Sequence, residues 1–164
     1  MFKRLFVLAV AVLTLGVASD ASAQIKYKVY HNDLTINVLR CFVQSDGSCV
    51  VDFLMENNSM KDWKIQHIPK GDTGHKNRAY DDMGNSYSSI LVAIGSTDKY
   101  LQWGYPSFDF PEGVALKVRA KIDDISEIAT VIKRLDLDII SRQWTCGDDA
   151  FRKPITIMNI PISR

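Results

Sequence analysis

The chain lacks an excess of charge of either sign. Its 164 residues include 20 lysines and arginines against 19 aspartates and glutamates. Domains that bind nucleic acid usually carry a basic excess gathered on one face. The balanced composition therefore argues against a nucleic-acid partner, and it gives no sign of electrostatic attachment to an acidic membrane surface.

The sequence also lacks the common motifs of hydrolases and metal sites. It has no Gly-x-Ser-x-Gly elbow, the nucleophile motif of many hydrolases. The three histidines, His31, His67 and His75, are too far apart in sequence to match the short spacing of common zinc ligands. Oxygen-bearing side chains surround Gly84 in residues 81–85, but they do not alternate over about twelve residues as calcium ligands do. Asp and Asn favour turns by bonding their own backbone, so we interpret this stretch as a turn. We expect no catalytic residue, metal ion or cofactor, and this favours a protein that is not an enzyme.

Only three cysteines are present, Cys41, Cys49 and Cys146. Cys146 precedes a glycine, as a nucleophile can, but the acidic neighbours Asp148 and Asp149 would raise the pKa of its thiol. No cysteine-protease signature surrounds it. We interpret Cys146 as the unpaired cysteine of an odd set.

Strand phase indicates which two cysteines pair. Within residues 39–43, Cys41 lies on the apolar face of the predicted strand. Within residues 49–55, Cys49 lies on the apolar face of the next predicted strand. A hairpin about residues 45–47 can place the two cysteines opposite each other and inward, close enough for a bridge. Because exported proteins keep disulfides, we predict a Cys41–Cys49 disulfide. The alternative is two buried free thiols.

The N-terminus reads as a cleavable secretory signal over residues 1–23. Lys3 and Arg4 precede a short apolar run, and Ala21-Ser22-Ala23 supplies the small residues of a cleavage site. The run is shorter than the 20 or so residues of a membrane span. Cleavage would leave one domain, residues 24–164, with 18 basic and 18 acidic residues. We therefore expect an exported protein, periplasmic or secreted, without stable membrane insertion after cleavage.

The remaining pattern is that of an all-β domain. Residues 114–122 alternate apolar and basic side chains, as in a strand of a sheet with one wet face. Asp46-Gly47 is a hairpin signal, and the phase slip at Val38-Leu39 indicates a β-bulge. Eight or nine short strands predict an immunoglobulin-like two-sheet sandwich, with a closed barrel as the alternative.

One short helical segment is predicted near residues 125–133. Asp124 can cap it, and Glu127 follows three residues later. Ile125, Ile128 and Ile132 then recur at helical spacing. Two turns or so would fit between the flanking strands.

Between residues 50 and 137 the chain resembles a group of small exported bacterial immunoglobulin-like β-sandwich proteins of unknown function. The resemblance rests on VDFLMEN (51–57), Ser59, Asp62, AYDDMGNSY (79–87), FPEG (110–113) and residues 132–137. It implies the sandwich fold. It implies no activity, because fold alone does not determine function.

Aromatic side chains in loop regions suggest binding. Trp103 and Tyr105 flank a glycine, and exposed rings serve sugar-binding modules and protein interfaces. The alternative is that Trp63 or Trp103 fills the core. We expect a non-enzymatic binding or interaction module whose partner is a protein or glycan of the cell envelope. A carbohydrate-binding module built on Trp103 and Tyr105 is the alternative, and a small hydrolase with a dispersed site is a third possibility.

Overall fold

The computed structural model describes residues 25–29, 34–60, 62–67, 77–95, 108–143 and 150–164, and all regular structure in this part is β. The strands are β1 (Lys26–Val29), β2 (Leu34–Val43), β3 (Cys49–Asn57), β4 (Trp63–His67), β5 (Arg78–Asp81), β6 (Ser86–Tyr87), β7 (Ile90–Ile94), β8 (Phe108–Phe110), β9 (Ala115–Ile122), β10 (Val131–Gln143) and β11 (Ala150–Pro161). They number eleven in these residues, more than the eight or nine predicted. None of the described residues belongs to a helix that is long and apolar enough to cross a membrane.

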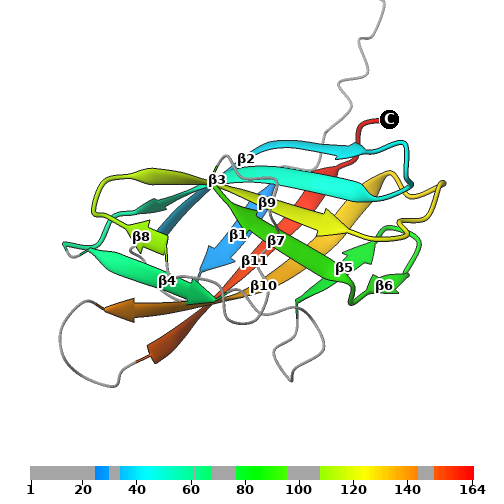
Figure 1. Ribbon diagram of the computed structural model, residues 1–164. Coiled ribbons are helices and arrows are strands. Elements are labelled where there is room, and N and C mark those ends of the chain that lie inside the picture. Colours follow the sequence, from blue (N-terminus) through cyan, green and yellow to red (C-terminus); the bar gives the residue numbers. More distant parts are fainter. Residues whose placement is uncertain (1–24, 30–33, 61, 68–76, 96–107, 144–149) are drawn as a thin grey trace, which may run out of the picture.

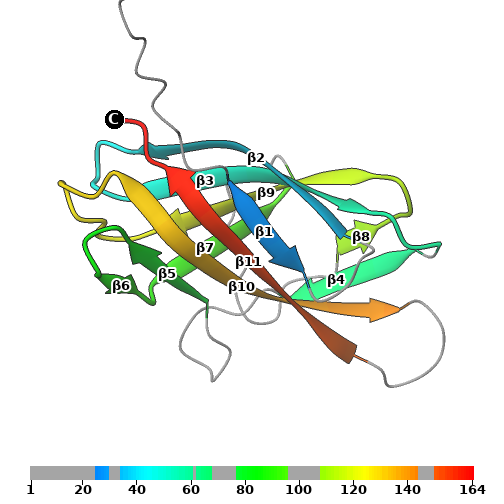
Figure 2. The same ribbon diagram turned by 180° about the vertical axis from the view of Figure 1, so that it is seen from behind.

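The strands form two antiparallel sheets (Figure 1). The seven-stranded sheet has the order β1-β11-β10-β4-β8; off this path, β5 pairs with β10 and β6 pairs with β5. The first half of the long strand β10 pairs with β5 and its second half pairs with β4. The four-stranded sheet has the order β2-β3-β9-β7. Figure 2 shows β10 and β11 crossing the molecule with β1 beside β11.

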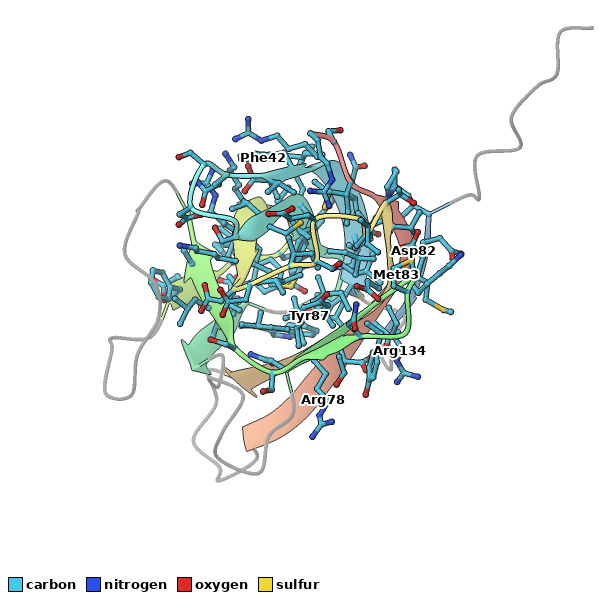
Figure 3. The ribbon with its side chains drawn as sticks, turned by 90° about the vertical axis from the view of Figure 1, so that its right-hand side faces the viewer. Phe42, Arg78, Asp82, Met83, Tyr87 and Arg134 are labelled. Atoms are coloured by element: carbon cyan, nitrogen blue, oxygen red, sulfur yellow. The ribbon has the colours of Figure 1, made fainter. Side chains whose placement is uncertain are left out.

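A single core fills the space between the sheets. It includes Phe53 and Val118 from the four-stranded sheet and Leu135 and Ile157 from the seven-stranded sheet. Strand β9 shows the predicted alternation, because Val118, Ala120 and Ile122 are buried while the basic residues between them are half-buried. The end view in Figure 3 places Phe42 at one outer surface, Arg78 and Arg134 at the other, and Tyr87 between them.

Two predicted details of the β2–β3 hairpin are confirmed. The register between the strands shifts between Val38 and Arg40, so the bulge lies at the predicted phase slip. Gly47 adopts a φ of 79°, which L side chains rarely adopt, and the Ser48 amide donates to the Asp46 carboxylate. The Asp-Gly pair therefore reverses the chain for the reason that its sequence indicates.

The predicted helix near residues 125–133 is wrong. Residues 123–130 form turns, and strand β10 begins at Val131. Asp124 adopts a φ of 55°, whereas a helix N-cap needs an extended conformation. Ile125 is buried and Ile128 is exposed, so the two do not form one apolar helical face.

Candidate functional site

The aromatic pair proposed for binding, Trp103 and Tyr105, lies outside the described residues, and so does Cys146. Trp63 is described and belongs to the core. Its ring meets the ring of Phe110 edge-on, with the centroids 6.0 Å apart. The core alternative is therefore correct for Trp63.

Cys41 and Cys49 both point into the core, with their Sγ atoms 3.3 Å apart as two thiols. The sequence predicts that the two cysteines lie directly opposite each other on paired strands, and this register is wrong. The loop of residues 44–48 closes with a bond from Gln44 N to Ser48 O, which places Val43 opposite Cys49 and Cys41 opposite Val51. The cysteines are therefore diagonal neighbours on the inner face. The hydrogen bond with Cys49, together with burial, raises the pKa of the Cys41 thiol.

The end of the molecule seen in Figure 3 carries three turns, residues 44–48, 82–85 and 123–130, which we call the loop end. Its second turn is organised by Asp81, a buried carboxylate. Asp81 accepts hydrogen bonds from four donors: Met83 N (2.9 Å), Asn85 N (2.9 Å), Asn85 Nδ2 (2.8 Å) and Tyr87 OH (2.7 Å). Burial alone would raise the pKa of Asp81, but these hydrogen bonds outweigh burial and lower it. The sequence interpretation of residues 81–85 as a turn is thus confirmed.

Hydrogen bonds also tie this turn to the turns that follow β9. Thr130 donates from its amide and its hydroxyl to the Asp82 carboxylate. The Asp82 amide donates to Val131 O at 3.0 Å, and the Ser126 amide donates to Tyr87 OH at 3.1 Å. The second and third turns of the loop end therefore form one hydrogen-bonded unit.

Two large apolar side chains project from this unit. Met83 is 55% exposed and Ile128 is 67% exposed. Figure 3 shows Met83 beside Asp82 at the edge of the loop end. The sequence pattern does not reveal either residue, because Met83 lies among turn-forming residues and Ile128 fits the spacing of an apolar helix face.

The outer face of the four-stranded sheet holds a second unusual group. The Asp52 side chain has no exposed area, although it points away from the core. Arg40 Nε and Arg119 Nε each lie 2.7 Å from its carboxylate oxygens, and Lys117 Nζ lies 3.8 Å away. Burial by itself raises the pKa of Asp52, but the hydrogen bonds from Arg119 and Arg40 outweigh burial and lower it. In the sequence, the sign of this group is a charged residue, Asp52, between the apolar residues Val51 and Phe53 of a strand.

Comparison with known proteins finds no matching family model and no matching curated protein. Among the described residues, no three or more His, Cys, Asp or Glu side chains gather closely enough to hold a metal ion.

Proposed function

We propose that the chain is an exported, non-enzymatic, immunoglobulin-like sandwich that binds a macromolecular partner in the periplasm or outside the cell. The partner contacts the loop end. The observation that carries this proposal is the exposure of Met83 and Ile128 on turns whose polar groups are engaged with one another.

Burial of Met83 and Ile128 against a partner would stabilise a complex. Full burial of a large apolar side chain contributes about 1.5–3 kcal/mol, so two of them on hydrogen-bonded turns can anchor an interface. Met is also adaptable in shape, which suits a contact surface. Because hydrogen bonds already order the turns, binding would cost little additional conformational entropy.

Charge around the two apolar side chains defines the chemistry of the partner. The third turn carries Asp123, Asp124 and Glu127, and Asp82 lies beside Met83. Arg164 is a cation beside the third turn, and it donates to the carbonyl groups of Ser126 and Ala129. A partner surface that combines apolar side chains with lysine or arginine would complement this arrangement.

The test compares capture of envelope proteins by three forms of the purified protein. The first is the native protein and the second is the double variant Met83→Ser/Ile128→Ser. The third is Met60→Ser, a matched control, because Met60 is 89% exposed and lies between β3 and β4. All three forms should melt alike, since surface substitutions usually change stability by no more than about 0.5 kcal/mol.

We expect the same proteins to be captured by the native and Met60→Ser forms and to be lost with the double variant. A retained protein should also be released at high salt, since the surrounding charges contribute. Capture that survives the double substitution, or that fails equally in the Met60→Ser form, would show that the loop end is not the binding surface.

A further inference from the structure

The cluster around Asp52 carries more positive charge than its buried carboxylate can balance. Three cations, Arg40, Lys117 and Arg119, surround one carboxylate at 2.7 to 3.8 Å. The other carboxylate on this face of β3, Glu56, is four residues along the strand, roughly 13 Å away. Within this cluster three cationic side chains stand against one carboxylate.

The basic side chains on this face form a regular array. Lys117, Arg119 and Lys121 occupy alternate positions of β9, so their backbone positions follow one another at roughly 7 Å along the strand, and Lys121 is paired with Asp46 at 2.8 Å. Arg40 approaches Asp52 from β2 and Arg119 from β9, so the two side chains converge on one carboxylate from strands roughly 10 Å apart. The basic positions continue along β9 beyond this cluster, so a ligand with repeated anionic groups can contact more of the row than a single small ion can.

Asp52 also orients the guanidinium groups before any ligand arrives. Arg40 binds Asp52 through Nε, and its guanidinium carbon lies 4.8 Å from the centre of the Phe42 ring. The Arg40 side chain is nevertheless 55% exposed, and that of Lys117 is 42% exposed. A guanidinium fork held in one orientation matches the two oxygens of a carboxylate or sulfate group, at low entropic cost.

We propose that the outer face of β2, β3 and β9 binds an acidic polysaccharide, that is, a glycan chain bearing carboxylate or sulfate groups. Arg40 and Lys117 make the direct contacts, and Asp52 is a positioning residue. A membrane fits this face less well, because interfacial binding needs several apolar side chains to bury: Phe42 and Leu54 are already half-buried, and Leu39, 49% exposed, is a single apolar side chain among the cations. The side chains proposed to contact this ligand, Arg40 and Lys117, differ from Met83 and Ile128 of the loop end, so either proposal can fail alone.

The test measures binding of the purified protein to immobilised heparin and to immobilised polygalacturonate, which separate sulfate from carboxylate recognition. Neutral dextran is the background. The variant pair Arg40→Gln/Lys117→Gln is compared with Arg78→Gln/Lys133→Gln, which removes the same charge from exposed positions of the seven-stranded sheet. We expect the first pair to weaken binding by about tenfold or more, and the second to change it little.

Lys117→Gln alone guards against a loss of folding, because the two arginine–Asp52 contacts remain in that variant. It should weaken binding with an unchanged melting temperature, whereas Lys133→Gln should do neither. Equal weakening by both variant pairs, equal retention on dextran, or no binding to either acidic glycan would overturn the proposal. Binding to mixed phosphatidylcholine and phosphatidylglycerol vesicles in preference to both glycans would also overturn it.

Discussion

Asp52 and Asp81 are buried aspartates whose hydrogen bonds more than offset the cost of removing charge from water. Asp81 uses backbone amides, an amide side chain and a phenol, whereas Asp52 uses two guanidinium groups. An unpaired buried carboxylate would be protonated instead. Each aspartate therefore couples the stability of the fold to the charge of its carboxylate.

The charge of Asp52 makes the free energy of unfolding depend on pH. The pKa of Asp52 is lower in the folded protein than the value of about 3.9 in an unfolded chain. Its stabilising contribution is therefore complete above about pH 5 and is lost as the pH falls through the folded pKa. Asp52→Asn should lower the free energy of unfolding at pH 7 by about 2–3 kcal/mol. This is less than the 3–5 kcal/mol of a fully buried pair, because both arginines reach solvent.

Urea unfolding at pH 7 and at pH 3 checks this prediction. The difference between the native protein and Asp52→Asn should shrink at pH 3, which lies below the pKa of about 3.9 of an unfolded aspartate, so part of the stabilisation from the charge is lost there. Thr35→Ala, an exposed site on the same sheet, serves as the control. A difference of equal size at both pH values would contradict the role of the Asp52 charge.

At the scale of elements, the turns of the loop end show how local signals compete with tertiary contacts. Residues 125–132 have helical spacing of isoleucines, but the structure buries Ile125 and Ala129 and exposes Ile128. The Ser126 and Thr130 amides donate to Tyr87 and Asp82 across the interface between the turns. Two or so turns of helix are marginal alone, so these contacts decide the conformation.

The prediction at this scale concerns Gly84, which adopts a φ of 86° within the β5–β6 turn. A Cβ at this position would meet no atom within 4 Å, so the cost of Gly84→Ala comes from the backbone and should be about 1–2 kcal/mol. Gly84→Asn should cost less, because Asn tolerates the left-handed region. Equal losses for the two variants in thermal or urea unfolding would show that the backbone conformation is not the cause.

At the scale of the whole molecule, balanced composition conceals an uneven distribution of charge. The outer face of β2, β3 and β9 carries Arg40, Lys117 and Arg119 around one buried carboxylate. The charged residues in the three turns of the loop end are acidic. The net charge of the chain therefore does not indicate the charge of its individual surfaces.

The prediction at this scale joins export to the redox state of the core. If residues 1–23 are removed in an oxidising compartment, the intact mass of the exported product should correspond to a chain starting at Gln24. Before reduction it should be two hydrogens lighter than after, because the Cys41 and Cys49 thiols, 3.3 Å apart, are oxidised to a disulfide.

Thiol titration of the unfolded, unreduced product should then find one free group, at Cys146. Closing so short a loop stabilises by less than about 3 kcal/mol, so Cys41→Ser should still fold. A product that retains Met1 contradicts export, and three titratable thiols contradict the disulfide.

The sequence by itself determined the all-β class, the β2 bulge, the Asp46-Gly47 turn and the two faces of β9. These depend on alternation and turn chemistry, which are local and have a fixed period. Tertiary structure decided the features that depend on residues distant in the chain. The register that sets Cys41 diagonal to Cys49 follows from how the hairpin loop closes, and the turns at residues 123–130 follow from partners some 40 residues earlier. Burial of Asp52 needed arginines from both neighbouring strands, and no local pattern specifies that meeting.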